Sequence, residues 1–63
     1  MIDDILINKI SKTKNPRLIK LAWGGISEYR FMAHKSSGFL RKYYNTRANQ
    51  FEDKLREALK GEK

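Results

Sequence analysis

Residues 37–60 read SGFLRKYYNTRANQFEDKLREALK, and this stretch decides the fold. Its apolar side chains recur every three or four residues over about five turns, which is the period of one face of an α-helix. The stripe comprises Leu40, Tyr44, Ala48, Phe51, Leu55, Ala58 and Leu59. Glu52 and Arg56 are spaced as a favourable i to i+4 pair, and Gly61 stands where a left-handed residue often terminates a helix. We therefore expect one long C-terminal helix from about Ser37 to Lys60.

The segment before it, residues 26–35, also has helical periodicity. One side carries Ile26, Tyr29, Met32 and Ala33, and the other carries Ser27, Arg30 and His34. Ser36-Ser37-Gly38 is a break, and either serine is suited to cap the helix that follows.

Residues 16–23 contain the clearest helix start in the chain. Asn15 can cap free amides, and a proline at the first helical position loses no hydrogen bond. We expect Gly24 to end this helix, which makes residues 16–35 resemble a helix-turn-helix in outline, although two glycines form a looser turn than that motif usually has. The alternative is a β-hairpin at Gly24-Gly25. It is disfavoured because strand pairing would place Lys20 on one face with core residues.

Residues 2–12 predict a short amphipathic helix. Ile2, Ile5, Leu6 and Ile10 have helical spacing, and Asp3 and Asp4 favour the positive end of the helix dipole. A polar connector, Ser11 to Lys14, follows. The fold class expected for residues 1–63 is therefore all-α: one domain, a small bundle of three to four helices with a long C-terminal helix. An α+β fold with the hairpin is the alternative.

The chain is short, at 63 residues, and it has no cysteine. A core this small supplies little net stability, so idealised helix packing, self-association or a partner must supply the rest. The acidic N-terminus and the absence of a long apolar run argue against a signal peptide or a membrane span. Together with the lack of cysteine, these features predict a cytoplasmic protein.

The charge is concentrated in the middle of the chain. The formal net charge is +7, and the stretch from Lys9 to Arg47 holds ten basic residues against one acid, Glu28. Charge gathered in this way is typical of a binding surface for a polyanion, whereas charge that serves only solubility is more often mixed along the chain.

Catalytic and metal-binding equipment is not expected. With one histidine and no cysteine, the sequence cannot build a Cys-His or His-rich metal site, and it contains no glycine-rich phosphate loop. Asp3 and Asp4 are a close pair of acids, and helix-end electrostatics accounts for them. We therefore predict a protein that is not an enzyme and that needs no cofactor.

The candidate site is a face of basic and polar side chains. It comprises Arg17, Lys20, Arg30, His34, Lys35, Arg41, Lys42, Asn45, Arg47 and Asn49. The lysines and arginines would neutralise phosphates, and Asn45, Asn49 and His34 would supply any base specificity. Arg47 falls at the edge of the apolar stripe, so we expect its stem to be covered and its head to contact a phosphate or an acid of another helix.

The leading hypothesis is a small nucleic-acid-binding accessory or regulatory protein, for which the sequence does not separate DNA from RNA or monomer from homo-oligomer. The alternative is a protein-binding module or inhibitor that docks on an acidic surface of a larger protein or ribonucleoprotein assembly. Membrane-surface binding is disfavoured because Glu52, Asp53 and Glu57 lie along the polar side of the long helix.

Overall fold

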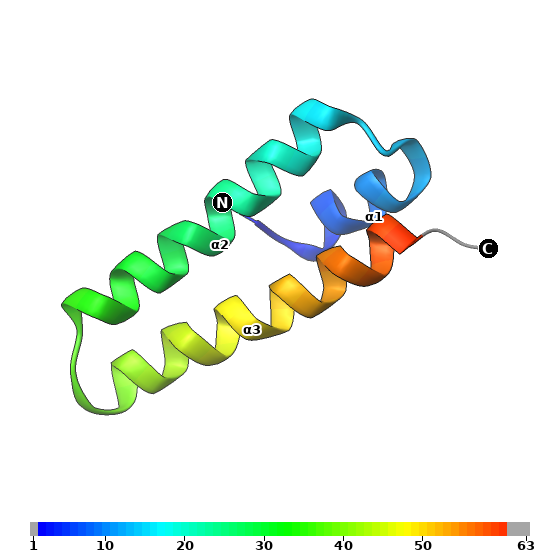
Figure 1. Ribbon diagram of the computed structural model, residues 1–63. Helices are drawn as coiled ribbons and strands as arrows, with labels where there is room; N and C mark the ends of the chain where they lie inside the picture. Colours follow the sequence, from blue (N-terminus) through cyan, green and yellow to red (C-terminus); the bar gives the residue numbers. More distant parts are fainter. Residues whose placement is uncertain (1, 61–63) are drawn as a thin grey trace.

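The computed structural model describes residues 2–60, and its fold there is three helices with no strand. They are α1 (Asp4–Thr13), α2 (Pro16–Lys35) and α3 (Gly38–Lys60). Figure 1 shows α2 and α3 side by side as a long antiparallel hairpin, with α1 packed against its open end. The expected all-α bundle with a long C-terminal helix is confirmed, and the α+β alternative is wrong. Gly61, the expected terminator, lies outside the described residues.

The helix ends follow the local sequence signals. The side chain of Asn15 accepts a hydrogen bond from the backbone N–H of Arg17 at 2.9 Å, so the predicted start of α2 is confirmed. Asp3 caps α1 in the same way, through Leu6 N–H at 2.9 Å. This helix begins two residues later than expected and ends at Thr13, followed by Lys14 in the left-handed conformation.

The break between α2 and α3 lies where the sequence places it. Ser36 is the C-cap of α2, and its N–H donates to the carbonyl oxygen of Ala33 at 3.2 Å. Gly38 opens α3 with a φ of +65°, a conformation that costs glycine little.

The expected end of a helix at Gly24 is wrong, because α2 runs without interruption from Pro16 to Lys35. The helix-turn-helix outline is wrong for the same reason. A glycine inside a helix costs about 1 kcal/mol relative to alanine, and packing on both sides of the pair outweighs that cost. Gly25 has a specific role in this packing: a Cβ there would lie 2.8 Å from the backbone nitrogen of Ile2. The N-terminal segment therefore crosses α2 at Gly25, because a residue with a side chain would collide with Ile2 there.

All three helices contribute to the core. Ile10, Ala22 and Leu55 are fully buried, and the rings of Tyr29 and Phe51 are stacked with centroids 6.0 Å apart. Ile5 was expected on the buried side of α1, but it is 69% exposed, and Ile7 is buried instead. Ile5 is exposed because it lies about 140° around the helix from the buried Ile10.

The end of the hairpin near its connection is not covered by α1. At 1.5 Å per residue, the ten residues of α1 span only about half the length of α2 or α3. Several large apolar side chains at this end of the hairpin are therefore exposed, including two that were expected in the core, Met32 and Leu40. The exposed set at this end is Phe31, Met32, Phe39, Leu40 and Tyr43. Among residues 2–60, no helix has both the length and the apolar character needed to cross a bilayer.

Candidate nucleic-acid interface

The site is built around an open hollow between α2 and α3, near the hairpin connection. It measures about 370 Å³ and is lined by Arg30, Ala33, His34, Arg41 and Asn45. Four of these are candidate site residues from the sequence, two from each helix. The antiparallel pairing of α2 and α3 brings them together although up to 15 positions of sequence separate them.

Arg41 is held in place by the end of α2. Its Nε donates to the backbone oxygens of Ala33 at 3.2 Å and Ser36 at 3.0 Å, where the last carbonyls of a helix lack partners within it. A guanidinium at this position also offsets the negative end of the helix dipole. Because Nε alone makes these bonds, the four N–H donors on the two Nη atoms remain for other acceptors.

A chain of polar contacts continues along the same side of the hairpin toward its open end. Arg30 on α2 donates to Asn49 at 3.3 Å and also pairs with Glu52, both on α3. Glu52 in turn accepts from Arg56 at 2.7 Å, so the expected i to i+4 pair is confirmed. The guanidinium of Arg56 on α3 lies 5.7 Å from the ring centre of Trp23 on α2. This cation–π contact is a further link between the two helices.

The pKa of the Glu52 carboxyl is lowered by this arrangement. The main cause is the hydrogen bond from Arg56, and the hydrogen bond from Arg30 adds to it. Both stabilise the ionised form. Glu52 is therefore a fixed carboxylate held between two guanidinium groups.

We call this side of the hairpin the basic face. It comprises Lys20, Arg30, His34, Arg41, Lys42, Asn45, Asn49 and Arg56, arranged around Glu52. Lys42 belongs to it because it lies three and seven residues before Asn45 and Asn49, and Lys20 because it lies three residues before Trp23. Within residues 2–60, these eight residues and Glu52 carry five lysines and arginines and one acid, a formal net charge of +4 with His34 neutral, and a second acid, Asp53, borders them four residues after Asn49.

Three candidate residues lie elsewhere. Arg17 and Lys35 are each about 140° around α2 from Arg30, and both are exposed on the outer side of the helix. Arg47 lies on the opposite flank of α3, with its guanidinium 4.9 Å from the ring centre of Phe51 and its Nε buried without a hydrogen-bond partner among the described residues. The expected ion pair of Arg47 with an acid of another helix is absent from residues 2–60.

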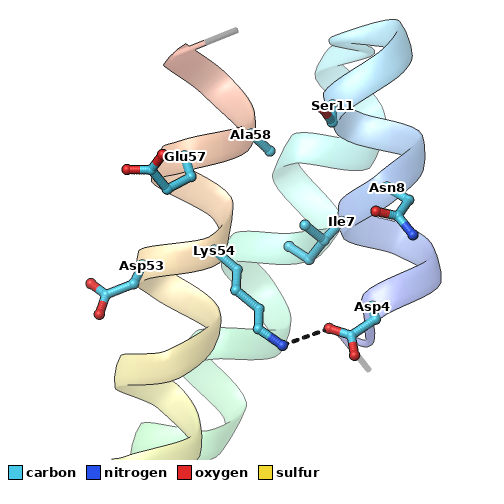
Figure 2. A pocket seen from close by; sticks show the side chains of 8 residues that line it. All are labelled: Asp4, Ile7, Asn8, Ser11, Asp53, Lys54, Glu57 and Ala58. Carbon is cyan, nitrogen blue, oxygen red and sulfur yellow. Dashed lines mark hydrogen bonds and ion pairs between the residues drawn. The ribbon is translucent and has the colours of Figure 1, made fainter. Parts of the chain in front are cut away.

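The flank of α3 that faces α1 has the opposite charge. Figure 2 shows the groove between these two helices, where Lys54 reaches across to pair with Asp4 at 2.8 Å. Asp53 and Glu57 also line this groove, with their carboxylates turned away from Lys54.

Sequence reasoning missed Arg56 as a member of the face. The signal was present, because Asn45, Asn49, Glu52 and Arg56 follow one another at spacings of four, three and four along one side of α3. In residues 2–60, no group of three or more His, Cys, Asp or Glu side chains is placed to hold a metal ion. No family model, curated protein or solved structure matches the chain.

Proposed function

We propose that this protein binds the phosphate backbone of nucleic acid through the basic face. The observation that carries the proposal is the composition of that face: two helices contribute five lysines and arginines, and Glu52, the acid among them, is already paired with two arginines. Lysines and arginines that neutralise phosphates release condensed counterions, and this term supplies most sequence-independent affinity for nucleic acid.

The shape of the face favours contacts to phosphates over contacts to base edges. One α-helix is about 10–12 Å wide with its side chains and fills the major groove of duplex DNA, which is about 12 Å wide. The basic face spans two helices side by side, about 20 Å across, so it cannot enter a groove as a unit. Base specificity through Asn45, Asn49 or His34 remains a prediction from the sequence.

The salt dependence of binding tests the proposal. With about five phosphates neutralised, a plot of log affinity against log salt for duplex DNA should fall with a slope near −0.9 per phosphate. Fluorescence anisotropy with labelled duplex DNA, single-stranded DNA and RNA measures this slope and identifies the preferred polymer. A binding constant indifferent to salt would refute the proposal.

Two paired substitutions test whether the basic face is the surface that binds nucleic acid. Arg41→Ala with Lys42→Ala removes two charges from the basic face, and Arg17→Ala with Lys35→Ala removes the same charge from the outer side of α2. We expect the first pair to weaken binding to all sequences similarly, and by about tenfold more than the second pair. Equal losses would mean that net charge, and not this face, determines the affinity.

Because Arg41 also holds the end of α2, a second comparison avoids it. Lys42→Glu and Lys35→Glu reverse one exposed charge each, on and off the face. The ordering of affinities should be the same, with circular dichroism confirming that both variants retain their helices.

Docking on an acidic protein surface is the second candidate function. The exposed apolar end of the hairpin favours it, because Met32 and Leu40 would add affinity to contacts that charge alone initiates. This function predicts no binding to DNA or RNA at low salt. It also predicts salt-dependent binding to an acidic amphipathic peptide that is lost when Met32 and Leu40 are changed to serine.

A further inference from the structure

We infer that the hollow between α2 and α3 binds a single phosphate group, and we call it the phosphate seat. This inference rests on the proposed function and assigns one phosphate contact to a defined position. Four of the five residues that line the hollow have side chains that can donate hydrogen bonds to a phosphate: Arg30, His34, Arg41 and Asn45. Among residues 2–60, no carboxylate lines it. Arginine matches the geometry of phosphate oxygens because its planar fork can donate two parallel hydrogen bonds.

The orientation of the donors is set before any ligand arrives. Arg41 is anchored through Nε to the carbonyl oxygens of Ala33 and Ser36, and Arg30 is anchored through one Nη atom to Asn49 and Glu52. Each guanidinium keeps further N–H groups beyond those bonds. A phosphate that binds between them therefore does not have to immobilise two long side chains, which is a major cost of binding at flexible surfaces.

The neighbouring Glu52 demonstrates the same chemistry within the protein. Its carboxylate is held by Arg30 and Arg56, one from each helix of the hairpin. The hollow lies two to three turns farther toward the connection along α3, and it again has one arginine from each helix, Arg30 and Arg41. At roughly 30 Å³ per water molecule, its volume of about 370 Å³ accommodates a phosphate group with several waters.

The deciding experiment compares two variants that gain the same charge at different positions. Asn45→Asp places a carboxylate in the hollow, and Gln50→Glu places one on the outer side of α3, about 140° around the helix from Asn45. Both change the net charge equally, and each conserves the size of its side chain. We expect Asn45→Asp to lower affinity for an oligonucleotide about tenfold more than Gln50→Glu, which corresponds to about 1.4 kcal/mol of local repulsion.

The source of the phosphate is identified by a second arm. The affinities are measured for one oligonucleotide with a 5′-phosphate and one with a 5′-hydroxyl. If the affinities of the two variants differ with both oligonucleotides, the seat binds a backbone phosphodiester. If their affinities differ only with the 5′-phosphorylated oligonucleotide, the seat binds a terminal phosphate. Inorganic phosphate, titrated at constant ionic strength, should shift the NMR signals of His34, Arg41 and Asn45 in the wild-type protein and not in Asn45→Asp.

Two outcomes overturn the inference and can be told apart. If the two variants lose affinity equally while the wild type binds with a steep salt slope, the seat does not exist and the basic face still binds nucleic acid. If the wild type binds no nucleic acid at low salt, both the seat and the proposed function fail.

Discussion

Gly24 and Gly25 are neighbours in α2 with opposite surroundings. A Cβ at Gly24 would meet nothing within 4 Å, whereas a Cβ at Gly25 would lie 2.8 Å from the nitrogen of Ile2 and 2.9 Å from its Cβ. The two positions lie in the same helix with the same backbone conformation. Substitutions at them therefore distinguish the low helix propensity of glycine from its role in close packing.

We expect Gly24→Ala to raise the free energy of unfolding by about 1 kcal/mol, the difference in helix propensity. Gly25→Ala gains the same propensity but must displace Ile2, whose burial contributes about 1.5–3 kcal/mol, so it should be destabilising by about 0.5–2 kcal/mol. Urea denaturation followed by circular dichroism measures both. Similar changes at the two sites would contradict the packing of Ile2 against α2.

At the scale of the elements, Glu52 joins α2 to α3 through Arg30 and Arg56. A carboxylate whose pKa is lowered on folding stabilises the protein fully above its unfolded pKa, near 4.5, and this contribution is lost as the pH falls through the lower pKa of the folded state. The contribution is therefore constant at neutral pH and disappears in acid.

The difference in unfolding free energy between the wild type and Glu52→Gln should consequently be constant from pH 6 to 8 and shrink below about pH 4.5. Glu57→Gln is the matched control, because the Glu57 side chain is 76% exposed and its contact with Lys60 is long, at 3.7 Å. That variant should follow the wild type at every pH, within about 0.5 kcal/mol. A wild-type to Glu52→Gln difference that persists in acid would show that the carboxylate does not act through its charge.

The helices and their ends were predictable where a local signal determines them. Asn15-Pro16 is such a signal, because capping involves only residues adjacent in sequence. The Ser36–Gly38 break was also predictable, although Ser36 is the C-cap of α2 and was expected to cap the helix that follows. The continuity of α2 through Gly24 and Gly25 was not predictable in this way, because it depends on Ile2 packing against α2 from another part of the chain. The low helix propensity of glycine disfavours a helix at these two positions, and tertiary packing stabilises it there.

The candidate site was predictable in part for the same reason. Arg41, Lys42, Asn45 and Asn49 share one side of α3, and helical periodicity identified them together. Periodicity cannot tell how two helices are rotated relative to each other. That rotation places Arg30 and His34 of α2 beside Asn45, and it leaves Arg17 and Lys35 on the outer side.

At the scale of the whole molecule, one small core supports all three helices. Leu55 is fully buried in that core, whereas Leu21 is 62% exposed on α2. Leu55→Ala should cost about 2–5 kcal/mol, which is comparable to the total stability of a domain this small.

Circular dichroism at 25 °C should therefore show that Leu55→Ala has lost most of its helix. Leu21→Ala is the matched control and should change the unfolding free energy by less than about 0.5 kcal/mol. Retention of full helicity by Leu55→Ala would mean that something besides this core holds the three helices together.

The connections between the helices are two residues long, at Lys14-Asn15 and Ser36-Ser37, so α2 packs directly against its neighbours along the chain, and α1 packs in addition against the distant part of α3. Little loop entropy has to be lost before such contacts form, and barriers to folding are correspondingly low. Small helical bundles of this kind reach the native state in microseconds to milliseconds. We expect an opened molecule to reclose on this timescale, which limits the time for which its buried core is accessible to other chains.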